Sequence, residues 1–252
     1  MNQSFYIGAV GAQMQQRRLN IIGDNVANLN TVGFKANRSD FTALLYQNHR
    51  GALAGEANTE LPMGVGTRLL MTSTHFAQGP VEDTGRNLDY MIEGDGFFAL
   101  VDLATGEVSY TRNGAFIMSE LERPSNEVDE NGQPVMEKVF CLGDDEGRFV
   151  LSEQGGLIEV TDPSEKLPIG IFDYANYNGM LQLDDTRFLP IDKNGGLWYG
   201  TGKLHQGLLE GSNADLAEEY TKVIESQRAY GMALKMVQTS DEIETTINNL
   251  RS

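Results

Sequence analysis

The chain has 252 residues and carries 36 acidic against 19 basic side chains, a formal net charge of −17. Such an acidic surface repels phosphate backbones and anionic lipid headgroups, which argues against nucleic-acid binding and membrane docking. The single cysteine, Cys141, rules out an internal disulfide and a cysteine-rich zinc site. No run approaches the about 18 apolar residues of a membrane span, and the first twenty residues lack the apolar core of a cleaved signal peptide. We therefore expect neither membrane insertion nor a cleaved signal.

The N-terminal segment has a helical period. Side chains recur every seven residues in two neighbouring rows, which are Phe5, Ala12, Leu19, Val26 and Gly8, Gln15, Ile22, Leu29. The rows predict a helix over about residues 3–28 with one partly apolar stripe, and such a helix has little to stabilise it alone. Asn28, Asn30 and Gly33 follow, and these residue types tolerate the left-handed backbone found at helix ends and turns.

The middle of the chain changes to a strand-like period. Glycines and Pro62 in residues 46–69 predict an irregular connector, and residues 70–205 then alternate short apolar runs with glycine turns. The predicted strands are Leu88–Ile92, Phe97–Val101, Val108–Thr111, Ala115–Met118, Val135–Leu142, Arg148–Leu151, Leu157–Val160, Ile169–Phe172, Met180–Leu183 and Phe188–Ile191. Even spacing of short strands predicts a compact β-rich domain over 70–205.

The C-terminal segment returns to a helical period. Ser212 or Asn213 suits an N-cap, and two apolar rows follow, which are Leu216, Val223, Tyr230, Val237 and Tyr220, Gln227, Leu234. The stripe then shifts to Met236, Ile243, Ile247 and Leu250, so the heptad register slips.

These elements predict an α+β chain in which long N- and C-terminal α-helices flank a central mainly-β domain. The predicted segments are 1–45 (N-terminal helix), 46–69 (connector), 70–205 (β-rich domain) and 206–252 (C-terminal helix). The apolar seam of each helix needs a cover, which either the other helix or another copy of the chain would supply.

No motif for catalysis or cofactor binding stands out. Gly94-Asp95-Gly96-Phe97-Phe98-Ala99 matches a dinucleotide pattern, but a strand-like run follows where the motif needs a helix. His49, His75 and His205 lie far apart in the sequence, and no acidic turn completes a calcium loop. We expect no metal, no cofactor and no enzymatic activity. A hydrolase using one of many possible carboxylate pairs stays open as an alternative, as does a soluble adaptor whose helices grip a partner.

Four sequence runs carry a resemblance. They are Asp24–Lys35, Ile92–Phe98, Tyr110–Phe116 and Glu210–Glu219 with the following Gln227–Tyr230. In type and order they resemble the signatures of the bacterial flagellar rod and hook family, across nearly the whole chain. Within that family, the length favours a rod protein over the longer hook protein.

The resemblance implies a structural subunit with both terminal helices in the inner coiled-coil-like layer of a helical tube. It implies assembly with copies of itself, with other rod proteins, with the hook protein and with the surrounding basal-body rings. It also implies export through the flagellar type III apparatus, without a cleaved signal, to the basal body outside the cytoplasmic membrane. We expect the assembly interface to use Leu19, Ile22, Asn25, Val26, Asn28, Gly33, Phe34, Leu216, Tyr220, Val223, Gln227, Tyr230, Leu234 and Val237. Of these, Asn25, Asn28, Gly33 and Phe34 would fix where the chain leaves the inner layer.

Overall fold

The computed structural model describes residues 3–43, 46–50, 60–64, 67–128 and 134–250. The chain divides into two compact units. The first comprises Met1–Ala27, Asn37–His75 and Asp215–Ser252, and the second comprises Asn28–Ala36 and Phe76–Ala214. Each unit is thus assembled from segments that lie far apart in the sequence.

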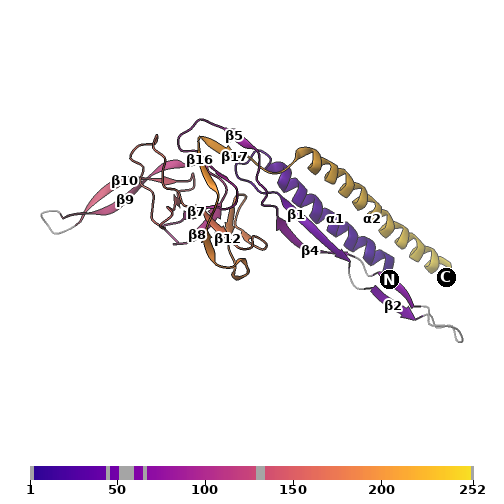
Figure 1. Cartoon of the computed structure of the whole chain (residues 1–252). Coiled ribbons are helices and arrows are strands. Elements are labelled where there is room, and N and C mark those ends of the chain that lie inside the picture. Colours follow the sequence, from indigo (N-terminus) through magenta and orange to yellow (C-terminus); the bar gives the residue numbers. More distant parts are fainter. Residues whose placement is uncertain (1–2, 44–45, 51–59, 65–66, 129–133, 251–252) are drawn as a thin grey trace. The chain divides into compact units, whose positions relative to one another are not determined.

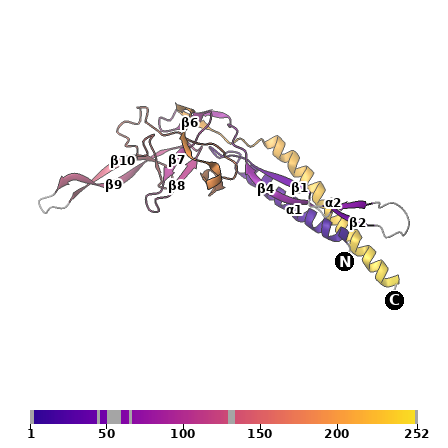
Figure 2. The same cartoon turned by 60° about the horizontal axis from the view of Figure 1, so that its bottom comes forward.

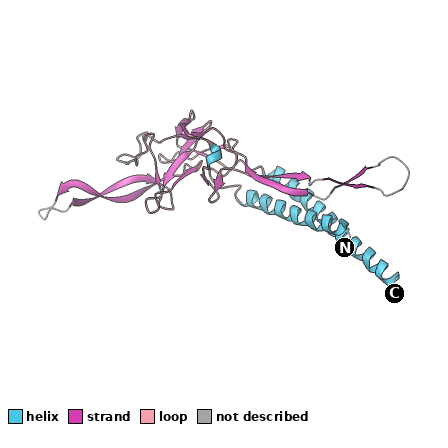
Figure 3. Ribbon diagram, turned by 90° about the horizontal axis from the view of Figure 1, so that it is seen from below, coloured by secondary structure: helices cyan, strands magenta, loops and turns pink. Residues whose placement is uncertain are grey.

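Two antiparallel helices form the first unit together with paired strands (Figures 1 and 2). The helices are α1 (Gln3–Ala27) and α2 (Leu216–Leu250). Ser4, near the start of α1, lies opposite Ser240, and its hydroxyl is 3.1 Å from that of Ser240. Arg18, further along α1, pairs instead with Glu225. The last turns of α2 therefore continue past the start of α1, as Figure 3 shows.

The start of α2 differs from the prediction. Asp215 caps the helix, because its Oδ1 accepts hydrogen bonds from the backbone N–H groups of Ala217 (2.8 Å) and Glu218 (3.3 Å). The hydroxyl of Ser212 instead accepts from Ala214. Residues 212 and 213 were thus wrongly predicted as the N-cap, since a good capping side chain also stabilises the turn before a helix.

Strands occupy much of the segment that sequence patterns assign to an irregular connector. β1 (Asn37–Ala43) pairs antiparallel with β4 (Thr67–Thr74), and β2 (Tyr46–Arg50) pairs with β3 (Glu60–Gly64). The irregular assignment is therefore wrong for the described part of 46–69, while residues 51–59 and 65–66 lie outside the described residues. Glycine and proline at strand ends hid the pairing, because they punctuate strands as readily as loops.

The second unit is built on an antiparallel sheet of seven strands in the order β13-β14-β8-β7-β11-β10-β9. Their bounds are β7 (Phe98–Val101), β8 (Val108–Thr111), β9 (Ile117–Val128), β10 (Pro134–Gly143), β11 (Phe149–Val150), β13 (Leu181–Gln182) and β14 (Arg187–Leu189). Three two-stranded pairs join it, made from β5 (Val81–Asp83) with β17 (Leu208–Glu210), β6 (Tyr90–Glu93) with β16 (Lys203–Gln206), and β12 (Phe172–Tyr174) with β15 (Leu197–Tyr199). A single 3₁₀ turn spans Asp192–Asn194.

Most predicted strands are present, and the fold class is confirmed. Residues 157–160 instead make isolated bridges through Leu157 and Glu159. The acidic segment after Ser119 forms the long β9–β10 hairpin, which extends away from the rest of the sheet (Figure 3). Two buried clusters form the core of this unit, one around Tyr90, Phe98 and Phe116 and one around Phe97 and Phe188.

Candidate functional site

The seam between α1 and α2 is made of small side chains at close range. A Cβ atom on Gly8 would come within 2.9 Å of Val237 Cγ2 and 3.1 Å of the Ala233 carbonyl oxygen. Gly11 likewise faces the Cβ of Ala233. At Gly8 the two helices therefore lie so close that a side chain larger than that of glycine does not fit without movement.

Of the first predicted row of α2, Val237 packs against Gly8 of α1. Val223, Tyr230 and Val237 are half-buried. In the adjoining row Glu219, Ser226 and Ser240 are buried and Ala233 is half-buried. Tyr220, Gln227 and Leu234 of the second predicted row are exposed in the single chain, so their place in an assembly interface stays a prediction. Leu216, at the start of α2, is also exposed.

On α1 the predicted residues divide between buried and half-buried positions. Ile22 and Asn25 are buried, whereas Leu19 and Val26 are half-buried. The Asn25 amide holds the start of β1, since its Oδ1 accepts from Asn37 N (2.8 Å) and its Nδ2 donates to Asn37 O (2.9 Å). Asn25 therefore fixes where the strand begins after the helix.

In the second unit, Gly33 and Phe34 pair with the chain that leads to α2. Gly33 N donates to Glu210 O (2.7 Å), and Asn213 N donates to Phe34 O (3.3 Å). Gly33 has φ 72°, and a Cβ there would lie 2.3 Å from Asn113 N. Only glycine fits this position, because it needs both left-handed backbone and close approach. Asn28 is half-buried in the turn, and its backbone carbonyl accepts from Thr31 N.

A buried ion cluster lies beside this pairing and was missed by sequence analysis. Lys35 Nζ contacts Glu210 Oε1 and donates to Ala77 O (2.9 Å), while Arg112 Nη1 lies 3.2 Å from Glu210 Oε2. Gly79 N also donates to the Glu210 carboxylate. Burial lowers the pKa of Lys35, against the opposing effect of Glu210. All three charged residues lie in the quoted signature runs, but nothing in the sequence pairs them.

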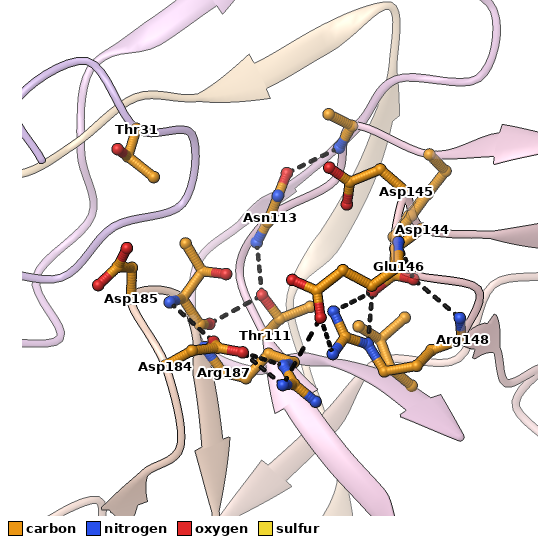
Figure 4. A pocket seen from close by; sticks show the side chains of 14 residues that line it. Thr31, Thr111, Asn113, Asp144, Asp145, Glu146, Arg148, Asp184, Asp185 and Arg187 are labelled. Atoms are coloured by element: carbon orange, nitrogen blue, oxygen red, sulfur yellow. Dashed lines mark hydrogen bonds and ion pairs between the residues drawn. The ribbon is translucent and has the colours of Figure 1, made fainter. Parts of the chain in front are cut away.

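A polar pocket in the second unit has a volume of about 290 Å³. Figure 4 shows Arg148 and Arg187 both turned toward Glu146. Arg148 also pairs with Asp144 (2.6 Å), and Arg187 pairs with Asp184. Burial acts to raise the pKa of Asp184, but Arg187 outweighs it and the pKa is lowered. Arg187 thus favours the ionised form of the Asp184 carboxyl.

Two further observations concern metal binding and membrane insertion. Among the described residues, no group of histidine, cysteine, aspartate and glutamate is arranged to hold a metal ion. Neither described helix has the length and apolar character needed to cross a membrane.

Comparison with known proteins finds similarity over both helices and over part of the β-rich unit. Three family models match the chain: "Flagella basal body rod protein" over residues 5–35, "Flagellar hook protein FlgE/F/G D1 domain" over 91–160, and "Flagellar basal body rod FlgEFG protein C-terminal" over 205–250. Flagellar basal-body rod protein FlgG of Buchnera aphidicola subsp. Schizaphis graminum is 32% identical, over 99% of this chain and 100% of that protein. FlgG of Bacillus subtilis strain 168 is also 32% identical, over 100% of both. The chain belongs to the flagellar basal-body rod family.

The family assignment confirms the resemblance read from the four signature runs. Flagellar basal-body rod protein FlgF of Caulobacter vibrioides is also similar, at 29% identity over 96% of this chain and 95% of that protein. This rod family is a structural one and not a family of enzymes, and its members are components of the flagellar basal body.

Proposed function

We propose that the chain is a distal-type subunit of the flagellar rod, which polymerises into a helical tube that transmits torque from motor to hook and carries the export channel. The distal assignment rests on the FlgG relatives and on the runs Leu44–Gln47, Gly64–Thr67 and Leu204–Leu209, whose sequences most resemble the distal rod protein. A proximal rod subunit is the alternative within the family, and the similarity to FlgF supports it less strongly.

The observation that carries this proposal is the bare apolar surface of α2. The exposed large apolar side chains of this helix are Leu216, Tyr220, Ile224, Met232, Leu234, Met236, Ile243, Ile247 and Leu250, between 40% and 83% exposed. So much apolar surface on one helix is typical of a protein interface. Burial against further copies of the chain would remove it from water and stabilise a polymer.

The partners and the export route that we propose are those that the family resemblance implies. The subunit would contact other rod proteins, the hook protein and the basal-body rings. It would reach the basal body through the type III export apparatus without a cleaved signal. A soluble helical adaptor remains the competing function, and it would form a one-to-one complex with a partner and not self-assemble.

A matched pair of substitutions on α2 tests the proposal. Leu234 is 40% exposed and outside the seam with α1, whereas Val237 packs against Gly8. Leu234→Asp should block polymerisation, measured by sedimentation and electron microscopy, and leave thermal unfolding of the monomer unchanged. Val237→Asp should lower the unfolding temperature of the helix pair. Polymers of normal length from the Leu234→Asp chain would contradict the proposed function.

A further inference from the structure

Glu219 presents a buried carboxylate oxygen without a hydrogen-bond partner among the described residues. The residue is 3% exposed, and its Oε1 accepts a hydrogen bond from Lys222 Nζ at 2.8 Å. Its Oε2 is buried and makes no hydrogen bond within the described part of the chain. Because a buried ionised oxygen is strongly destabilised without a donor, such an atom points to a missing cationic or N–H group.

Glu219 lines a pocket of about 300 Å³ in the first unit. Arg18 and Ile22 of α1, Arg38 of β1, and Glu218 and Lys222 of α2 also line it. Two of the three cations are already engaged, since Arg18 pairs with Glu225 (3.6 Å) and Lys222 bridges Glu218 (2.9 Å) and Glu219. Arg38 is exposed and makes no ion pair among the described residues, although its charge, after that of Lys222, helps to lower the pKa of Glu218. The pocket is large enough for the planar head of an arginine side chain.

The side chain of Arg228 is a cation that lacks an anionic partner among the described residues. It is exposed and has no ion pair or hydrogen bond from its side chain to any described residue. It comes two residues after Ser226 and two before Tyr230, which both face α1, so it points to the opposite side of α2. At four-residue spacing it interrupts an exposed row formed by Tyr220, Ile224, Met232 and Met236. Burying that row against another copy would bury the cation as well, which requires a carboxylate partner.

We propose that the guanidinium of Arg228 from one copy of the chain enters this pocket on a second copy and donates to Glu219 Oε2. The pair then provides a donor for the orphaned oxygen and an anion for the cation within the apolar contact. A planar guanidinium suits this role better than an ammonium group, because two of its N–H groups reach one carboxylate with fixed geometry. The inference rests on the proposed self-assembly and adds to it a residue-specific contact.

A double-mutant cycle on the full-length chain tests the pair. The measurement is the critical concentration for polymerisation, with Glu219→Gln, Arg228→Gln and both together. Each single variant should raise it about tenfold, and the double variant should be no worse than either single one. Arg228→Lys should recover only part of the loss. Lys235→Gln, which removes another exposed cation seven residues further along α2, should have no comparable effect.

The outcomes separate the two proposals. If the wild-type chain polymerises but the two substitutions add independently, or Arg228→Gln behaves like Lys235→Gln, the Arg228–Glu219 pair is wrong and the rod function stands. If Arg38→Gln, and not Arg228→Gln, couples to Glu219→Gln, the pocket takes its cation from its own chain and the pair is again wrong. A wild-type chain that never polymerises would contradict the proposed function and the pair with it. If Glu219→Gln unfolds the monomer, judged by circular dichroism, the cycle cannot be completed. The role of Arg228 is then decided by comparing the critical concentrations of the Arg228→Gln, Arg228→Lys and Lys235→Gln chains.

Discussion

Gly8 of α1 and Val237 of α2 set how closely the two helices approach. A Cβ atom on Gly8 would lie 2.9 Å from Val237 Cγ2, nearer than side chains pack, and 3.1 Å from the backbone oxygen of Ala233. Because the Ala233 oxygen belongs to the backbone, it cannot move away by a change of rotamer as a side-chain atom could. The glycine is therefore required by the helix pair, although it weakens α1 as an isolated helix.

Gly8→Ala should lower the free energy of unfolding of the helix pair. Overpacking of a tight contact costs about 1–3 kcal/mol, which exceeds the roughly 1 kcal/mol that alanine contributes to helix propensity. Urea unfolding followed by far-ultraviolet circular dichroism measures the difference. Gly23→Ala is the control, because no atom lies within 4 Å of its added Cβ and the same propensity gain should stabilise the chain. Equal stabilisation by both substitutions would show that Gly8 does not set the spacing.

The contact between Gly8 and Val237 bears on how much of the helix pair could be predicted from the seven-residue period. The seven-residue period predicted both helices; in the first row of α2, Val223, Tyr230 and Val237 are half-buried and Leu216 is exposed. Tyr220, Gln227 and Leu234 of the second row are exposed, and their burial against another copy stays a prediction. At the close contact itself, the partners of Val237 and Ala233 are Gly8 and Gly11, and apolar periodicity does not mark such small residues.

The ion cluster was beyond sequence analysis for another reason. Lys35, Arg112 and Glu210 come from three distant segments, and their pairing depends on the tertiary fold. Periodicity reports which face of an element is buried, but it carries no information on which distant charges meet. Strand positions in the β-rich unit were predictable because glycine turns and apolar runs are local signals.

Gly33 should tolerate substitution much less well than another glycine with the same backbone conformation. Gly33 and Gly85 have φ 72° and 63°, but a Cβ on Gly33 meets Asn113 N at 2.3 Å, whereas no atom lies within 4 Å of one on Gly85. Gly85→Ala should cost about 1–2 kcal/mol from left-handed backbone alone. Gly33→Ala should cost at least about 2 kcal/mol more, because the backbone must also move. Urea unfolding of both variants compares the two free energies, and equal losses would contradict this steric role.

Glu210→Ala should be among the most damaging single substitutions in the second unit. It leaves Lys35 and Arg112 buried without their carboxylate, and removal of one member of a buried ion pair costs about 3–5 kcal/mol. Lys35→Met is the matched control, because Glu210 keeps Arg112 as a partner and the apolar side chain fills similar space. It should cost less than Glu210→Ala in urea unfolding followed by near-ultraviolet circular dichroism. The reverse order would mean that Lys35, and not Glu210, holds the cluster together.

Two tyrosines, the buried Tyr174 and the half-buried Tyr177, should make the second unit unstable to alkali. Burial, followed by hydrogen bonds with Tyr110 and Asp173 respectively, raises the pKa of Tyr174 and Tyr177 well above the ordinary value of 10.0. Below that pH both the folded and the unfolded chain keep the phenol protons, so these groups give no pH dependence. Above it the unfolded chain releases protons that the folded chain retains, and stability falls as pH rises. Each tyrosine contributes a slope of up to about 1.4 kcal/mol per pH unit.

Thermal unfolding of the wild type and of the Tyr174→Phe/Tyr177→Phe variant between about pH 9 and 11 measures this slope. The variant should lose stability less steeply, because neither phenylalanine releases a proton. Lys35 acts in the opposite direction, since its lowered pKa makes stability rise with pH up to its ordinary value of 10.5. Lys35→Met should therefore steepen the alkaline loss of stability, while the tyrosine variant reduces it. Parallel curves for the wild type and the tyrosine variant would show that these two phenols do not control the alkaline limit.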